Sequence, residues 1–184
     1  KTDGMKLKHP CVGLLQSATI WDKTNEILIL ENILEKMPNI TFYWVGDGPY
    51  RDKILTKLKK FENFQWLGAL EYPDKIREYL SEIDVYALLS GIDMSPLTLQ
   101  EAQLMQKPVI ATNVGGIPEL MRNNETGFLI KKGDHKELLK KLEILITDKK
   151  ASQKMGGAGK EFVSNNFSWE IIAKDFKNKI EKHL

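Results

Sequence analysis

Six short apolar segments alternate with helix-type segments along this chain, and this alternation constrains its fold more than any other feature. The apolar segments span residues 10–16, 39–45, 63–70, 82–90, 108–112 and 126–130. The run at 82–90, EIDVYALLS, is almost continuously apolar, which is typical of a strand covered on both faces. Strands that alternate with helices usually pair in parallel through right-handed crossovers. The sequence therefore predicts a doubly wound α/β domain with a mainly parallel six-stranded sheet.

The segments between the strands have helical periodicity. In 22–38, apolar residues recur at helical spacing up to a stop at Pro38. Shorter helices are expected around 54–58, over 73–80, from Pro96 to about Met105, and as one turn after Pro118.

The last fifty residues are predicted to form further helices. Asp134 and Glu137 fit a capping box that opens a helix, and the glycine-rich MGGAGK at 155–160 predicts a break. A final helix over about 168–183 follows. Its apolar stripe recurs every fourth residue, at Ile172, Phe176, Ile180 and Leu184. Such a stripe is expected to pack against another surface.

Composition fits one soluble globular domain with a sizeable core, since 42% of the 184 residues are hydrophobic and 28% are charged. The 27 basic and 25 acidic side chains nearly balance, so net charge indicates neither a nucleic-acid nor a membrane partner. No apolar stretch is long enough to span a bilayer, and no signal peptide opens the chain. We therefore expect a protein of the cytoplasm, including the cytoplasmic face of the membrane. Residues 1–9 are expected to be a loose N-terminal segment or the boundary of an excised fragment.

The cysteine and histidine residues predict no catalytic thiol and no metal site. Cys11 lies in an apolar run, which fits core filling in a reducing compartment. His9, His135 and His183 are scattered, without metal-ligand spacing.

Glycine and small polar residues follow most of the predicted strands. In an open parallel sheet, ligands bind outside the carboxyl ends of the strands. The residues at these ends are Gln16, Ser17 and Lys23; Gly46, Asp47 and Gly48; Gly68; 90–93; and 113–116. They indicate a cleft where backbone approaches a ligand, although glycines also end strands with no ligand nearby. VGDGP lacks the third glycine of a dinucleotide fingerprint, so it gives little support for a simple NAD site.

The stretch GIDMSPLTLQEA (91–102) is more specific. Ser95 suits an N-cap and Pro96 the first helical position, which leaves the amides of Leu97 and Thr98 free as an anion site. One carboxylate precedes this helix start and another lies in its second turn. Acids on either side of a phosphate would repel it but could accept hydrogen bonds from hydroxyls. A nucleotide sugar, with ribose, diphosphate and hexose in a row, has that form.

A second cluster lies at the neighbouring strand end. Gly115 and Gly116 allow close backbone approach, and Glu119 is expected to open the next short helix. An ordinary strand-to-helix turn with an exposed glutamate explains the same residues.

Several ordered motifs resemble the C-terminal, donor-binding domain of retaining GT-B glycosyltransferases of the group 1 type. The family includes mannosyl- and glucosyltransferases and sucrose or glycogen synthases. The resemblance runs from Pro10 to the end. The motifs are VGDGPYRDKI, FQWLGAL, DVYALLS, LQEA, KPVIATNVGGIPEL, ETGFLI and FSWEIIAKDF.

The resemblance implies a Rossmann-like half of a GT-B fold and a role for each matching residue. Asp93 would contact the transferred sugar and Glu101 the ribose hydroxyls. Lys23 and the backbone of 95–98 would hold the diphosphate. Gly46, Gly48 and Gly68 would border the nucleoside. The donor would be a UDP-, GDP- or ADP-sugar, with no further cofactor and no metal. The acceptor, a sugar, a lipid-linked compound or a small molecule, would bind an absent N-terminal domain, which could also attach peripherally to the membrane.

The chain also departs from the family pattern. Asp93 stands where a glutamate is usual, and Met94-Ser95-Pro96 replaces Gly-Phe-Gly. Leu14 takes the place of the arginine that clamps the diphosphate, and nothing in the sequence brings Arg51 or Arg122 there.

Three functions are compatible with these residues. The first is retaining transfer of a hexose to a hydroxyl acceptor, with this chain inactive on its own because it lacks the acceptor domain. The second is a non-catalytic nucleotide-sugar-binding module or a degenerate transferase, which the departures favour. The third is a glycoside hydrolase that uses Asp93 and Glu101, which the phosphate-type helix start between them disfavours.

Overall fold

A computed structural model describes residues 4–181 of the chain. Its sheet has six strands, all parallel, in the order β3-β2-β1-β4-β5-β6. The strands are β1 (Cys11–Leu15), β2 (Thr41–Val45), β3 (Phe64–Gly68), β4 (Val85–Leu88), β5 (Val109–Thr112) and β6 (Gly127–Ile130). All six predicted strands and the doubly wound topology are confirmed.

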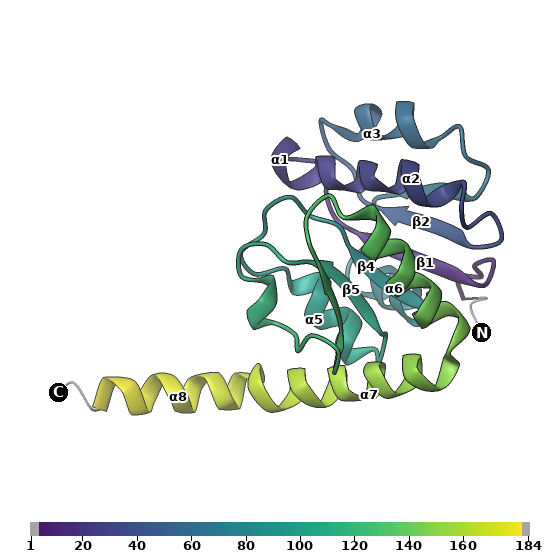
Figure 1. Cartoon of the computed structure of the whole chain (residues 1–184). Coiled ribbons are helices and arrows are strands. Elements are labelled where there is room, and N and C mark those ends of the chain that lie inside the picture. The colour runs from purple at the N-terminus through teal and green to yellow at the C-terminus, as the bar shows by residue number, and fades with distance from the viewer. Residues whose placement is uncertain (1–3, 182–184) are drawn as a thin grey trace.

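The helices cover both faces of this sheet (Figure 1). Before β4 they are α1 (Trp21–Thr24), η1 (Asn25–Leu30), α2 (Glu31–Leu34), α3 (Arg51–Leu58) and α4 (Asp74–Glu82). After β4 they are α5 (Leu97–Leu104), η2 (Ile117–Glu119), α6 (His135–Thr147), α7 (Lys149–Asn166) and α8 (Trp169–Glu181). No helix among residues 4–181 is both long and apolar enough to cross a bilayer.

Two apolar clusters lie on the two faces of the sheet, because alternate strand residues point to opposite sides. One cluster joins the sheet to η1, α2, α3 and α6. The other joins it to α4, α5 and η2. Cys11 is fully buried in the second cluster, and burial raises the pKa of its thiol to about 12. The thiol is therefore a poor nucleophile near neutral pH, as the sequence predicted.

The predicted helix over 22–38 is three short pieces that end at Leu34. The middle piece, η1, tightens to a 3-10 helix where Glu26 turns inward. Its buried carboxylate accepts a hydrogen bond from the backbone N–H of Gly133 at 2.6 Å. Burial raises the pKa of Glu26. This contact with the loop before α6 is a tertiary one, so periodicity alone could not show it.

The predicted break at 155–160 is wrong, because α7 runs without interruption through MGGAGK. Gly156 and Gly159 are buried, and their bare backbone faces Gln106, two residues beyond α5, and Gln103 of α5. A Cβ at Gly156 would collide with the carbonyl oxygen of Gln106. The glycines therefore permit close contact between α7 and the end of α5, as small residues do at tight helix crossings.

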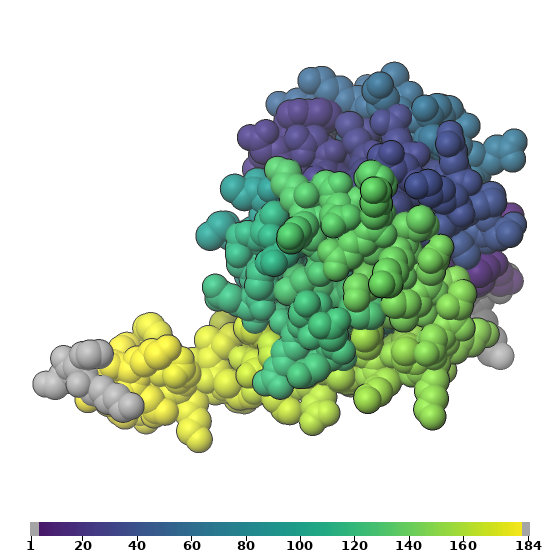
Figure 2. Space-filling model, viewed as in Figure 1, coloured from purple at the N-terminus to yellow at the C-terminus, as the bar shows by residue number. Residues whose placement is uncertain are grey.

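The last helix, α8, projects from the body of the domain, in line with the end of α7 (Figures 1 and 2). It has no buried residue, and Trp169 and Phe176 are 83% and 65% exposed. Ile172 and Ile180 of the predicted stripe are also exposed, whereas Leu184 lies outside the described residues. That the stripe packs against another domain remains a prediction.

Two neighbouring glycines of α7 provide a matched test of this packing. Gly156→Ala should lower the free energy of unfolding by about 1–3 kcal/mol, because the methyl group overpacks the contact with Gln106. Gly157 is exposed with open space around it, so Gly157→Ala should raise stability by about 0.5–1 kcal/mol. Urea denaturation measures both. Equal effects of the two substitutions would contradict the close packing of α7.

Candidate functional site

A cleft of about 530 Å³ opens at the carboxyl ends of the strands, where the sequence predicted a ligand site. It lies between the ends of β1, β2 and β4 and the start of α5. The polar residues that line it are Gln16, Ser17, Lys23, Asp47, Asp93, Ser95 and Thr98. Its apolar floor includes Leu15, Val45, Ile76 and Leu88. Of the predicted site residues, Lys23, Gly46, Asp93, Ser95, Leu97 and Thr98 line this cleft directly.

Asp93 and Lys23 form an ion pair in the cleft. The Nζ atom of Lys23 lies 2.7 Å from Oδ2 of Asp93, and the two side chains are 26% and 8% exposed. The Oδ2 atom is buried and has no hydrogen bond of good geometry among the described residues, so its contact with Lys23 is essentially ionic. The N–H of Gly91 donates to the carbonyl of Lys23 at 3.0 Å, which holds the two loops together.

The loop that carries Asp93 packs against Gly115 and Gly116. The N–H of Gly116 donates to the carbonyl of Asp93 at 2.9 Å, and a Cβ at Gly115 or Gly116 would collide with the backbone of Asp93 or Met94. The close backbone approach predicted at these glycines therefore serves another loop of the chain. Glu119 is exposed and ends η2, so the expectation that it opens a short helix is wrong.

The helix that follows Asp93 begins one residue later than predicted. Pro96 is the N-cap, with φ −70° and ψ 106°, and α5 starts at Leu97. Ser95 is not the cap, because no side chain caps this helix, and a residue before proline is biased toward extended backbone. The amides of Leu97 and Thr98 still lie in the first turn, where intrahelical acceptors are lacking. These amides therefore remain available to bind an anion, as predicted, because no capping side chain occupies them.

Tyr86 of β4 lies beneath this helix start. Its hydroxyl is 2.8 Å from Oγ1 of Thr98 and 3.3 Å from the carbonyl oxygen of Leu15. Burial raises the pKa of Tyr86, and the negative charges of Glu101 and Asp93 raise it further. One buried hydroxyl thus links the end of β1 to the first turn of α5 and lies within the field of both acids.

Glu101 lines a different, smaller cavity. This cavity has a volume of about 300 Å³ and lies between α4 and α5, with Tyr72, Pro73 and Leu104 among its lining residues. Ile76 lines both cavities, so they are neighbours along one edge of the sheet. Asp93 and Glu101 therefore face adjacent compartments and do not oppose one another across a single bond.

Gln16 is a polar cleft residue to which the sequence assigned no role. It is 5% exposed, and its Nε2 donates to the carbonyl of Leu89 at 2.8 Å. Its Oε1 is buried and has no hydrogen-bond partner among residues 4–181. A buried acceptor without a donor is costly unless a ligand supplies one. In the sequence, the only sign of this cleft residue is that a glutamine directly follows an apolar strand.

The glycine loop after β2 borders the same cleft. Gly46 donates its N–H to the carbonyl of Gly68 at 2.8 Å and accepts a bond from Nε1 of Trp66 at 2.8 Å. Side chains at Gly46 and Gly48 would collide with the backbone of Gln16 and Ala18. Gly46 therefore lines the cleft, whereas Gly48 and Gly68 shape the loops behind it.

The arginine that the family pattern places at position 14 has no substitute in the cleft. Leu14 is fully buried in the core. Arg51 pairs with Asp47 and Asp52 and lies over the ring of Trp66. Arg122 lies before β6, the outermost strand on one side of the sheet, and pairs with Glu125. Among the described residues, Lys23 is the cation that lines the cleft.

Residues 25–162 match the sequence profile of the family described as "Glycosyl transferases group 1". The chain belongs to this family. The match includes Asp93, Glu101 and the glycine loop after β2, while Lys23 lies just outside it.

Curated relatives of this group 1 glycosyltransferase chain are longer than it is. It is 41% identical over 78 residues to the capsular polysaccharide biosynthesis glycosyltransferase CapM of Staphylococcus aureus, a match that covers 42% of this chain and 20% of CapM. It is 28% identical over 153 residues to the sulfoquinovosyl transferase SQD2 of Arabidopsis thaliana, which covers 82% of this chain and 29% of that protein. The matched segments therefore cover less than a third of either relative.

Solved structures share the fold. The C-terminal domain of the glycosyl transferase group 1 protein LpcC from Francisella tularensis superposes with a TM-score of 0.74 at 22% identity, over 86% of each chain. HepE from Anabaena, in complex with UDP-glucose, gives 0.79 at 23% identity, over 94% of this chain and 49% of HepE. The fold of this chain is that of a GT-B C-terminal domain.

Removing Lys23 should lower the free energy of unfolding more than removing Asp93. Lys23→Gln leaves a buried carboxylate without its cation and should lower the free energy of unfolding by about 1–3 kcal/mol. Asp93→Asn leaves an ammonium that can turn to water, so it should cost less than about 1 kcal/mol. Lys60→Gln, which breaks the exposed pair with Glu31, is the control and should change stability by less than about 0.5 kcal/mol. Urea denaturation that reverses the order of the two cleft variants would contradict the burial of Asp93.

Proposed function

We propose that this chain is the donor-binding domain of a retaining hexosyltransferase whose donor is a nucleotide diphosphate sugar. The observation that carries the proposal is the composition of the cleft. A buried acceptor without a donor, on Gln16, and the buried carboxylate of Asp93 lie beside the cation of Lys23 and the uncapped start of α5. This combination suits a ligand that presents hydroxyl groups next to an anion.

The distance between Lys23 and Asp93 agrees with the chemistry of such a donor. In a nucleotide sugar, one oxygen joins the outer phosphate to the anomeric carbon, so the groups that bind phosphate and sugar must be neighbours. Their charged atoms are 2.7 Å apart. When the donor binds, Lys23 turns to the phosphate together with the amides of Leu97 and Thr98, and Asp93 accepts hydrogen bonds from sugar hydroxyls.

The nucleoside then extends along the sheet edge toward Glu101. Ile76 joins the cleft to the cavity that Glu101 lines, and the loop at Gly46 borders the other side. A carboxylate in that cavity can accept hydrogen bonds from both ribose hydroxyls. Because HepE was solved with UDP-glucose, UDP-sugars are the first donors to test.

The reaction transfers the hexose with retention of configuration. The bond from the anomeric carbon to the phosphate oxygen breaks, the acceptor oxygen bonds to that carbon on the same face, and the acceptor proton passes to the departing phosphate. The protein orients the donor and stabilises the negative charge that grows on the diphosphate, through Lys23 and the start of α5. The acceptor binds a second domain. The whole protein acts in the cytoplasm, including at the cytoplasmic face of the membrane.

Donor binding is tested by a thermal-shift panel. UDP-, GDP- and ADP-glucose are each added to the chain, and the donor at a hundred times its dissociation constant should stabilise the fold by about 2.7 kcal/mol. UDP-glucose should give the largest shift. No shift with any of the three at millimolar concentration would overturn the proposed function.

Two substitutions separate the roles of the acids. Asp93→Ala should reduce the affinity for UDP-glucose relative to UDP about tenfold or more, because only the sugar contact is lost and Lys23 remains for the phosphate. Glu101→Ala should weaken UDP and UDP-glucose equally. Glu143→Ala, on the exposed side of α6, is the control and should leave both affinities unchanged. Titration calorimetry measures the affinities of the wild type and the three variants for both ligands, and an exchange of the two patterns would overturn the assignment.

The isolated chain should bind donor without transferring sugar, because the acceptor is proposed to bind a second domain. Transfer by residues 1–184 alone, measured by product formation, would contradict this expectation. A non-catalytic binding module is the second candidate, which the burial of Leu14 and the Lys23–Asp93 pair favour. The protein in its natural length decides between the two, since a module would bind donor and neither transfer nor hydrolyse it.

A further inference from the structure

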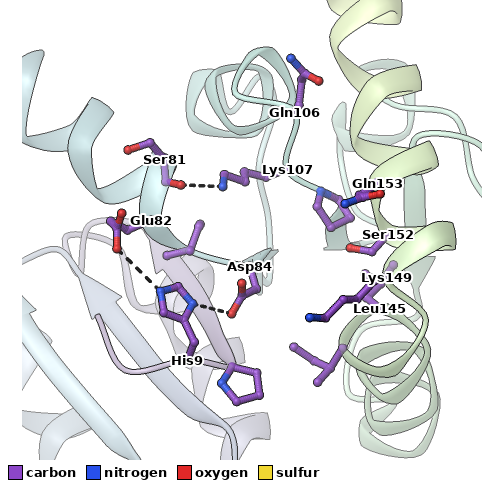
Figure 3. Close-up of a pocket in the computed structure, with 14 residues that line it drawn as sticks. His9, Ser81, Glu82, Asp84, Gln106, Lys107, Leu145, Lys149, Ser152 and Gln153 are labelled. Carbon is purple, nitrogen blue, oxygen red and sulfur yellow. Dashed lines mark hydrogen bonds and ion pairs between the residues drawn. The ribbon is translucent and has the colours of Figure 1, made fainter. Parts of the chain in front are cut away.

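A second cluster of polar side chains lies at the amino ends of the strands, opposite the cleft, where β1 and β4 begin. It borders a hollow of about 660 Å³ between these strand starts and the first turn of α7 (Figure 3). His9 and Cys11 come from the start of β1, and Asp84 immediately precedes β4. Because Val12 pairs with Val85 in the parallel register, Cys11 and Asp84 lie side by side.

We propose that His9, Cys11 and Asp84 form a site for a divalent transition-metal ion, with Zn²⁺ as its best-suited occupant. The proposal does not rest on the proposed function, since the two sites lie at opposite ends of the same strands. The three residues offer one nitrogen, one sulfur and one oxygen ligand, and all three donor atoms lie within 4.8 Å of one another.

The donor atoms are already close to the separations of a tetrahedral site. Nδ1 of His9 is 2.9 Å from Oδ2 of Asp84, and Sγ of Cys11 is 3.8 Å from Nδ1 of His9. Usual zinc bond lengths and a tetrahedral angle give about 3.4 Å between nitrogen and oxygen and about 3.6 Å between sulfur and nitrogen. Changes of a few tenths of an ångström would therefore admit the ion.

The surrounding groups have the arrangement that supports metal ligands. Nε2 of His9 lies 3.7 Å from Oε2 of Glu82, as Figure 3 shows, so its proton can be held there while Nδ1 faces the metal. The backbone N–H of Cys11 donates to Oδ2 of Asp84 at 2.7 Å and fixes that carboxylate. The two exposed ligands, His9 and Asp84, thus each have an orienting contact.

The exposed side of the cluster gives the ion access and a fourth ligand. The side chains of His9 and Asp84 are 46% and 42% exposed, and they face the hollow, so a water molecule can complete the tetrahedron. Lys107 lines the same hollow and donates to the carbonyl of Ser81 at 2.7 Å, and Figure 3 shows it directed there. Lys149 lines the far wall on α7.

The donor set selects the class of ion. Imidazole and thiolate suit Zn²⁺ and its neighbours in the first transition row, whereas Mg²⁺ and Ca²⁺ prefer oxygen ligands. Cys11 is buried, and a coordinating thiol is deprotonated outright by the metal. Binding therefore releases the thiol proton to solvent as the metal–sulfur bond forms.

Cobalt substitution tests the site with a signal that belongs to sulfur ligation. The chain is stripped of metal with a chelator, titrated with Co²⁺ and followed by absorption spectroscopy. One Co²⁺ per chain should bind, with the near-ultraviolet charge-transfer band of a cobalt–thiolate bond and the visible bands of a tetrahedral ion. Zn²⁺ should then displace it. A wild-type chain that shows no thiolate band would overturn the proposal.

Variants assign the ligands. Cys11→Ser should abolish the charge-transfer band, and His9→Gln should weaken Co²⁺ binding about tenfold or more. His9 is exposed, so His9→Gln should fold even if the buried Cys11→Ser does not. His135→Gln, at the first residue of α6, is the matched control and should bind Co²⁺ like the wild type. A band or affinity that His9→Gln leaves unchanged would show binding elsewhere and would overturn the site.

Discussion

The parallel pairing of β1 with β4 is the contact on which the rest of the structure depends. The chain builds β1, β2 and β3 outward in one direction and then returns to place β4 on the other side of β1. At such a switch point the loops after the two strands diverge, and they leave a crevice at the carboxyl edge. Gln16 directly follows β1, Lys23 lies in α1 just beyond it, and the loop after β4 carries Asp93. The same pairing brings Cys11 and Asp84 together at the amino edge.

The cleft balances its own charges when it holds no ligand. Lys23 and Asp93 neutralise one another, so a buried carboxylate and a nearby ammonium need no counterion. The proposed donor would have to replace this contact on both sides, and the energy of the ion pair would be subtracted from its binding. Asp93 is one methylene shorter than glutamate, so it reaches less far into the cleft. The ion pair and the short side chain both favour a donor held close to the loop that Gly115 and Gly116 support.

Much of this structure could be predicted from the sequence, because the signals were local. Strands and most helices follow from the spacing of apolar residues, and Asp93, Leu97 and Thr98 share a cleft because only a few residues separate them. The failures have tertiary causes. Gly156 and Gly159 predicted a break, but they face Gln106 and Gln103, about fifty residues earlier in the chain, at the end of α5 and just beyond it. Gln16 bonds to Leu89, and Cys11 to Asp84, each across 73 residues, a distance at which spacing carries no information.

The surface around the cleft supports the proposal that transfer needs a second domain. Large apolar side chains are exposed on the loops beside the cleft and at the start of α5, with Ile20, Ile92, Met94 and Leu97 between 51% and 74% exposed. A glycosyl donor activated in an open cleft would meet water, which is itself a hydroxyl acceptor. Transfer to another molecule requires that water be excluded while the donor reacts. Apolar residues at the rim can exclude water only when a second surface covers them, so the chemistry proposed for Lys23 and Asp93 depends on closure by another domain.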